Sequence, residues 1–131
     1  MKIHLASDHA GFELKNTIRD YLKENGYDVN DHGANQYDAL DDYPDYIFPC
    51  ANAVAADLES RGIIIGGSGQ GEAMAANRVN GIRAAVFYNG PKEIVKLSRK
   101  HNNANILSLG ARFISIDEVY DIIEMWISEP F

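Results

Sequence analysis

The sequence predicts an α/β protein, a Rossmann-like three-layer sandwich built on a five-stranded parallel sheet. Short apolar segments typical of buried strands alternate five times with segments whose apolar residues repeat every three or four positions. Neither internal repeats nor low-complexity linkers interrupt this alternation. It is typical of a parallel sheet covered by helices on both faces. Ligands in such sheets bind at the carboxyl ends of the strands.

Each predicted strand is a short apolar run that ends at a polar or glycine-containing turn. In chain order these strands lie at residues 2–6, 27–31, 63–65, 82–88 and 105–110. The connection after the second strand is an acidic, turn-rich segment at residues 35–45. It is too long for a minimal strand-to-helix connection, so we expect it to be a functional loop.

The first two predicted helices each have one apolar face. In the first helix that face is Leu14, Ile18, Tyr21 and Leu22, and Gly26 follows as the C-terminal cap. In the second helix the face is Ala51, Val54, Ala55 and Leu58. Cys50 lies in this helix behind Pro49, away from the loop edge, and we expect it to be a packing residue.

The last three predicted helices follow the third, fourth and fifth strands. Glu72 opens a short helix, and a long one starts near Pro91, because proline is tolerated at the first helical position, and ends near His101. Ser115 and Glu118 form a capping box for the last helix. The apolar face of that helix is Val119, Ile122, Ile123, Trp126 and Ile127.

Composition limits the class of protein. The 131 residues are 46% hydrophobic, which suits one ordinary globular domain. A net charge of −7 without a basic cluster argues against nucleic acid as a partner. No apolar run approaches membrane-spanning length, and no signal peptide precedes the first strand. The single cysteine excludes an internal disulfide. We expect a cytoplasmic protein with no membrane contact.

The glycine-rich segment at residues 66–71 is the main functional signal. A strand, a glycine loop and a helix N-terminus together form an anion site, yet Glu72 places a carboxylate there. The third glycine of the dinucleotide fingerprint is replaced by Glu72 or Met74, depending on the register, and no Gly-Lys-Ser/Thr pattern occurs. A nucleotide module is therefore disfavoured. A base beside main-chain donors suits proton abstraction next to a carbonyl; the alternative is an ordinary first-turn glutamate on the surface.

Other polar residues follow strand or helix ends that we expect to lie at the same edge. His9 and His101 are candidate acid–base groups or hydrogen-bonded structural residues. Asp8 orients an imidazole, binds a hydroxyl or forms a turn. Asn102 is a hydroxyl ligand or a helix cap, and Arg112 is a phosphate clamp or a surface ion pair. No metal-ligand spacing occurs.

Several motifs in the same order resemble type B ribose-5-phosphate isomerase, a family that includes galactose-6-phosphate isomerase subunits. The resemblance covers almost the whole chain. Its motifs are Ser7-Asp8-His9-Ala10-Gly11-Phe12, Asp42-Tyr43-Pro44, Gly66-Gly67-Ser68-Gly69-Gln70-Gly71-Glu72, Ala75-Ala76-Asn77, Gly81-Ile82-Arg83 and His101-Asn102-Asn103-Ala104-Asn105.

The resemblance implies a cofactor-free and metal-free interconversion of ribose 5-phosphate and ribulose 5-phosphate. One branch of the family uses a cysteine base where this chain has Gly66, and the other uses a glutamate, which Glu72 matches. His101 then resembles the acid that assists ring opening. The implied substrate ligands are Asp8, His9, Tyr43, Gly67, Ser68, Gly69, Gln70, Gly71, Asn102 and Arg112. A homodimer or homotetramer is also implied.

This sequence departs from the family pattern in one respect. Family members continue past the last helix with a tail whose arginines complete the phosphate site, often across a dimer interface, whereas this sequence stops at Phe131. We expect residues 1–131 to be a single sugar-phosphate isomerase domain without that tail: either the sequence is truncated or this protein binds phosphate with fewer charges. Loss of these charge-assisted contacts should mainly weaken substrate binding. Two alternatives stay open: an isomerase of a six-carbon sugar phosphate, and a non-catalytic sugar-phosphate-binding subunit.

Overall fold

Five strands form one parallel sheet, as the sequence predicts. The computed structural model describes residues 1–131. The strands are β1 (Lys2–Ser7), β2 (Asp28–Asp31), β3 (Arg61–Gly66), β4 (Ala84–Phe87) and β5 (Ile106–Gly110). Their order in the sheet is β2-β1-β3-β5-β4, and every neighbouring pair is parallel. The central strand β3 lies between β1 and β5.

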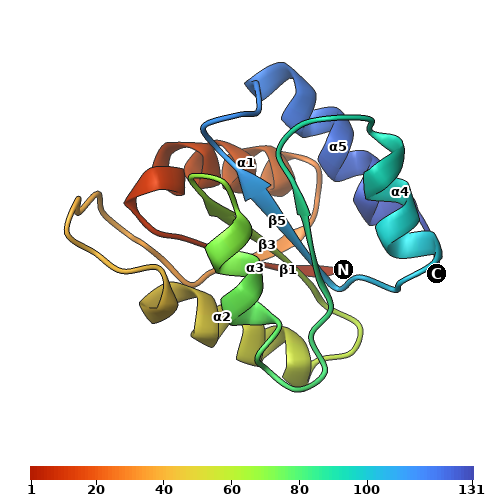
Figure 1. The fold of residues 1–131 in the computed structure, drawn as a ribbon, viewed down its shortest axis with the longest axis horizontal. Coiled ribbons are helices and arrows are strands. Elements are labelled where there is room, and N and C mark those ends of the chain that lie inside the picture. Colours follow the sequence, from red (N-terminus) through yellow and green to blue (C-terminus); the bar gives the residue numbers. More distant parts are fainter.

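Five α-helices cover the two faces of this sheet (Figure 1). They are α1 (Phe12–Glu24), α2 (Pro44–Ala56), α3 (Gln70–Ala76), α4 (Glu93–Lys100) and α5 (Ile116–Ser128), and a short 3₁₀ helix, η1 (His9–Gly11), precedes α1. Helices α1, α4 and α5 pack on one face, and α2 and α3 on the other. The three-layer sandwich is therefore confirmed. No helix is both long enough and apolar enough to cross a membrane.

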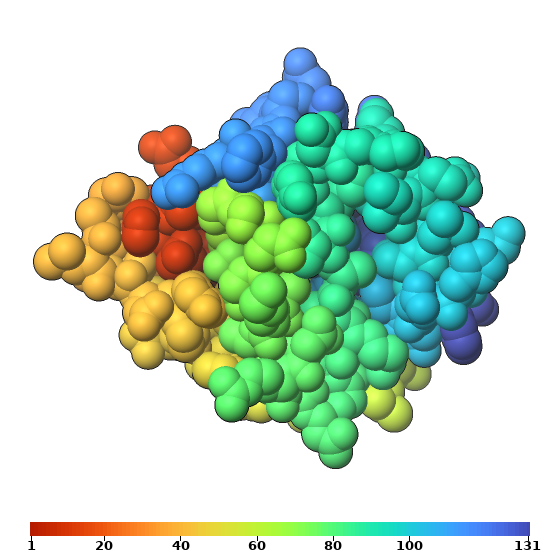
Figure 2. Space-filling view, viewed as in Figure 1, coloured from red at the N-terminus to blue at the C-terminus, as the bar shows by residue number.

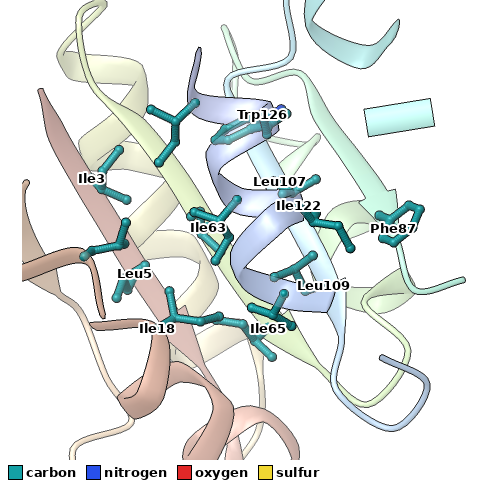
Figure 3. Packing of buried hydrophobic residues seen from close by; sticks show 14 of the residues in the cluster. Ile3, Leu5, Ile18, Ile63, Ile65, Phe87, Leu107, Leu109, Ile122 and Trp126 are labelled. Carbon is teal, nitrogen blue, oxygen red and sulfur yellow. The ribbon is translucent and has the colours of Figure 1, made fainter. Parts of the chain in front are cut away.

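The pleat of the strands divides the apolar side chains between two cores. In β3, Ile63 and Ile65 point to the face of α1 and α5, and Ile64 points to the face of α2 and α3. Figure 3 shows the larger core, where Trp126 and Ile122 of α5 lie over the strands. Both β3 faces are buried, which explains its uninterrupted isoleucine run.

Two predicted boundaries differ from the structure. Helix α2 ends at Ala56, so Leu58 lies in the following turn with 94% of its surface exposed, and it is not part of the apolar face. Helix α4 begins at Glu93, and Lys92 is its N-cap. Pro91, where the sequence predicts the start of this helix, therefore lies outside it. The predicted cap of α5 is half present: the Ser115 hydroxyl accepts a hydrogen bond from the Glu118 N–H.

Strand order places a topological switch point at the carboxyl edge of the sheet, between β1 and β3. The chain leaves β1 toward β2 on one side, and α2 then carries it back to β3 on the other side of β1. Connections that diverge in this way leave an opening at the ends of the strands between them. The turns after β1 and β3, which hold Asp8 and the glycine loop, flank this opening.

Candidate active site at the carboxyl edge of the sheet

Three strand ends bring the predicted site segments together. Ser7 of β1 pairs with Ile65 of β3, and Gly66 of β3 pairs with Gly110 of β5, so the turns that follow all begin at one level. The main-chain N–H of Arg112 donates to the carbonyl of Gly67 (3.1 Å), which joins the last two turns. Figure 2 shows the corresponding red, orange, green and blue segments adjoining on one face.

The glycine loop is held open by its own backbone geometry. Gly69 caps α3 with φ of +82°, a conformation that favours glycine, and its carbonyl accepts a hydrogen bond from the Ser108 hydroxyl (2.7 Å). The N–H groups of Gly67, Ser68 and Gly69 make no hydrogen bond to another main-chain group. The Gln70 N–H donates to the Ser68 hydroxyl (3.2 Å), while the Gln70 side chain is exposed. The loop thus offers free donors to a ligand.

Two side chains border the loop. A Cβ atom at Gly67 would lie 3.2 Å from the guanidinium carbon of Arg112, and one at Gly71 would lie 3.2 Å from the Tyr43 ring. Both glycines therefore permit close approach by a neighbouring side chain. Arg112 and Tyr43 come from distant parts of the chain, and both lie where the sequence predicts them.

Glu72 occupies a buried position beside the end of β3. Only 6% of the residue is exposed, and a Cβ atom on Gly66 would lie 1.7 Å from its Oε1. The Glu72 carboxylate thus fills the space that a side chain at position 66 would occupy. A larger residue at position 66 and a glutamate in this orientation are mutually exclusive.

The surroundings of Glu72 favour the protonated form of its carboxyl group, compared with a glutamate exposed to water. Burial raises the pKa of this carboxyl group, and the negative charge of Asp8 raises it further. Main-chain amide groups of Glu72 and Gly69 oppose the shift. A carboxylate with a raised pKa is a stronger base, which is the property needed to take a proton from carbon.

Asp8 and His9 follow β1 directly. Asp8 is buried, caps η1, and accepts a hydrogen bond from the Ala10 N–H (3.0 Å). His9 lies beside Asp41: its Nδ1 atom is 2.8 Å from Asp41 Oδ1. This hydrogen bond raises the pKa of the His9 imidazole; burial opposes it, and the charge of Asp8 adds to it. A protonated His9 suits an anionic ligand.

Asp41 is the site residue that the sequence reasoning missed. It lies in the segment at residues 35–45 that we expected to be a functional loop, but no local signal separates it from Asp38, Asp42 and Asp45. Asp8, His9 and Asp41 each offer a possible metal ligand atom within 4.8 Å of one another. Because His9 Nδ1 already bonds to Asp41, we interpret the three as a hydrogen-bonded ionic cluster.

His101 and Asn102 do not lie at this edge. The prediction that these two residues, which follow a helix, lie at the carboxyl edge is therefore wrong. His101 is the C-cap of α4, which runs back from the end of β4 to the start of β5. Its side chain is exposed, and Asn102 lines a cavity of about 490 Å³ with Asn77 and Arg83. The five residues of β5 separate these groups from the glycine loop by roughly 13 Å at the usual rise per residue.

The chain is similar to known proteins over nearly its full length. The family model described as Ribose/Galactose Isomerase matches residues 3–131. Ribose-5-phosphate isomerase B of Mycolicibacterium paratuberculosis is 42% identical over 131 residues, which is 100% of this chain and 81% of that protein. The probable ribose-5-phosphate isomerase B of Mycoplasma pneumoniae is 40% identical and covers 98% of this chain and 84% of its own length.

Two solved structures share the fold closely. Ribose-5-phosphate isomerase B of Mycoplasma genitalium, with bound ribulose-5-phosphate, has a TM-score of 0.94 and 40% identity over 99% of this chain and 85% of that one. The Clostridium thermocellum enzyme has a TM-score of 0.94 and 45% identity over 100% and 86%. Since sequence and structure match over essentially the full chain, this protein belongs to the ribose/galactose isomerase family.

Proposed function

We propose that this protein interconverts ribose 5-phosphate and ribulose 5-phosphate, with Glu72 as the base. The observation that carries the proposal is the buried Glu72 carboxylate, fitted into the space left by Gly66 and adjoining a loop of free main-chain donors. The identity with relatives named ribose-5-phosphate isomerase B supports the choice of substrate.

The proposed reaction moves one proton between two neighbouring carbons. Glu72 takes the proton from carbon 2 of the open-chain aldose and returns it to carbon 1, while the hydroxyl proton on oxygen 2 passes to oxygen 1. The negative charge of the enediolate forms between these steps, and the N–H groups of residues 67–69 are the donors that stabilise it. Glu72 moves the proton itself, so the proposal includes no metal or organic cofactor.

The phosphate group binds at the other side of the loop. Arg112 lies over Gly67, and His9 lies in the turn after β1, where its hydrogen bond to Asp41 raises its pKa more than the charge of Arg112 lowers it. A guanidinium and an imidazolium both donate charge-assisted hydrogen bonds to phosphate oxygens. Tyr43 forms a wall of the pocket beside Gly71. Asp8 is proposed as a ligand of the sugar hydroxyls.

A second copy of the chain completes the site in this proposal. His101 and Asn102 cannot reach Glu72 within one chain, because β5 separates them. In addition, neither Glu72 nor His9 lines any of the three cavities of the structure. A homodimer, alone or within a tetramer, that places His101 of one copy against Glu72 of the other would supply both the ring-opening acid and the missing wall. The cytoplasmic location stays a prediction from the sequence.

A coupled assay with ribose 5-phosphate on the purified chain tests the proposal. Conversion to ribulose 5-phosphate that is lost in Glu72→Gln supports it, and a wild-type chain with no conversion contradicts it. Because the family model also covers galactose isomerases, the same assay with six-carbon sugar phosphates tests the alternative substrate. Binding of ribose 5-phosphate without proton exchange with solvent would identify a non-catalytic subunit.

A further inference from the structure

The acidic segment between β2 and α2 folds back over the turn after β1. Asp41 lies within this mostly exposed segment, yet only 4% of its side chain is exposed. Its Oδ1 atom accepts a hydrogen bond from the His9 main-chain N–H (3.1 Å) and lies 2.8 Å from His9 Nδ1. One carboxylate oxygen therefore holds both the backbone and the ring of a residue 32 positions away.

This double contact determines which ring nitrogen is left for a ligand. A carboxylate only accepts hydrogen bonds, so Nδ1 of His9 must carry the proton that joins the pair. Nε2 is then the atom that remains free. The Tyr37 ring makes a T-shaped contact with the same imidazole, with the ring centroids 6.1 Å apart.

The charges around the pair favour an imidazolium. Asp41 Oδ2 is buried and has no hydrogen-bond partner, and its salt bridge is to His9 alone. A buried carboxylate without a cationic neighbour is costly, so the pair is most stable when His9 is protonated. The negative charge of Asp8 also raises the pKa of His9, and the positive charge of Arg112 opposes this shift.

We propose that Asp41 is a positioning residue for substrate binding: it fixes His9 by main chain and ring, and so keeps Nε2 as a charged donor for the substrate phosphate. The inference rests on the proposed function, which places the phosphate at His9. It also gives a role to the long acidic connection, whose length is needed to bring Asp41 back to β1.

Asp41→Asn tests this role, because asparagine keeps the size and one acceptor oxygen but removes the charge. We expect KM for ribose 5-phosphate near pH 8 to rise roughly tenfold, the size of one charge-assisted hydrogen bond, with kcat changed less than about twofold. The ratio of variant to wild-type KM should fall as the pH approaches about 6, where an ordinary histidine is protonated without help. NMR titration of the His9 ring should show a lower pKa in the variant.

Two controls separate positioning from a general effect. Asp38→Asn removes the same charge from the same segment, and asparagine keeps the acceptor oxygen that binds the Leu40 N–H, so KM should not change. In a His9→Gln background, Asp41→Asn should raise KM no further. A pH-independent KM ratio, or a full effect of Asp41→Asn without His9, overturns the inference.

The NMR measurement distinguishes failure of this inference from failure of the proposed function. An active wild-type enzyme whose His9 titrates identically in Asp41→Asn overturns the role of Asp41 and leaves the isomerase in place. A wild-type chain that isomerises nothing overturns the proposed function. In that case, titration with inorganic phosphate decides the role of Asp41: weaker phosphate binding by Asp41→Asn supports it, and unchanged binding overturns it.

Discussion

At the carboxyl edge of the sheet, two carboxyl groups lie buried close enough for one to shift the pKa of the other, whereas at the amino edge two guanidinium groups are hydrogen-bonded to main-chain carbonyls. Glu72 and Asp8 are both buried; burial raises the pKa of Glu72, and the negative charge of Asp8 raises it further. At the amino edge, Arg61 donates two hydrogen bonds from Nη1 to the carbonyls of Trp126 and Ile127 (3.0 and 2.8 Å), at the end of α5. Arg99 likewise donates to the carbonyls of Ala104 and Glu129.

This difference separates the groups that we propose to act on the substrate from the groups that hold the fold. Burial, followed by the charge of Arg99, lowers the pKa of Arg61 to about 10, but the guanidinium remains charged at neutral pH and satisfies the last carbonyls of a helix. A shifted pKa is therefore not enough to identify a catalytic group. At the carboxyl edge, free donors and convergent side chains accompany the shift, and that combination marks the site.

The largest expected effect comes from the carboxyl edge. Glu72→Gln keeps the shape of the side chain but removes the base, so kcat should fall by about 10²–10⁴-fold, the range for general base catalysis. The thermal unfolding temperature should not decrease. Steady-state kinetics and differential scanning calorimetry on the same preparation check both expectations, and near wild-type turnover would show that another group moves the proton.

The second prediction tests whether the carboxyl edge of one chain and the amino edge of a second chain form one active site. His101→Asn should lower kcat by about 10²-fold or more. Because the proposed dimer combines Glu72 of one chain with His101 of the other, mixing the Glu72→Gln and His101→Asn chains should restore up to roughly a quarter of wild-type activity. Mixing after denaturation and refolding ensures subunit exchange. No recovery in demonstrably mixed dimers would show that Glu72 of one chain and His101 of the other do not form one site.

The third prediction concerns the space beside Glu72. Gly66→Ala places a Cβ atom where the carboxylate now lies, so Glu72 must move or the strand must shift. We expect a loss of about 1–3 kcal/mol in the free energy of unfolding, as for other overpacked sites, and a large fall in kcat. Chemical denaturation and kinetics measure the two effects. Gly26→Ala is a control for glycine removal alone, since no atom lies within 4 Å of its added Cβ, although its positive φ still carries strain.

The fourth prediction tests the structural role of the amino edge. Arg61→Met keeps much of the side-chain volume and removes the two bonds to the end of α5. The free energy of unfolding should fall by about 1.5–3 kcal/mol, the range for hydrogen bonds of charged groups, while KM and kcat stay within about twofold. Urea denaturation supplies the first value. A rise in KM with unchanged stability would instead place Arg61 in a binding site.

The smallest expected effect is on the pH dependence of stability. A raised pKa in the folded state means that ionised Glu72 costs stability. This cost is absent below the ordinary glutamate pKa of about 4.3 and develops as the pH rises through the folded pKa. Glu72→Gln should therefore be more stable than the wild type at neutral pH, with the difference disappearing in acid. Melting temperatures over this range test the sign, and a less stable variant at neutral pH would contradict it.

Sequence alone predicts the fold and the convergence of several candidate site residues, because those signals are local. Apolar periodicity predicts the five strands and the helices, and the isoleucine run of β3 followed by glycines predicts the loop that presents Glu72. Asp8, His9 and Arg112 each follow a strand directly, so a parallel sheet must place them at one edge. Their convergence needs no knowledge of side-chain packing.

Tertiary structure decided where His101 lies and which aspartate binds His9. His101 follows a helix, and because helices of a parallel sheet run antiparallel to the strands, its end returns to the opposite edge. Asp41 is hydrogen-bonded to His9, which is 32 positions away in the chain. The segment at residues 35–45 contains four aspartates, and the sequence around them does not indicate which one bonds to His9. A hydrogen bond between distant residues depends on the path of the whole chain, which periodicity and local motifs do not describe.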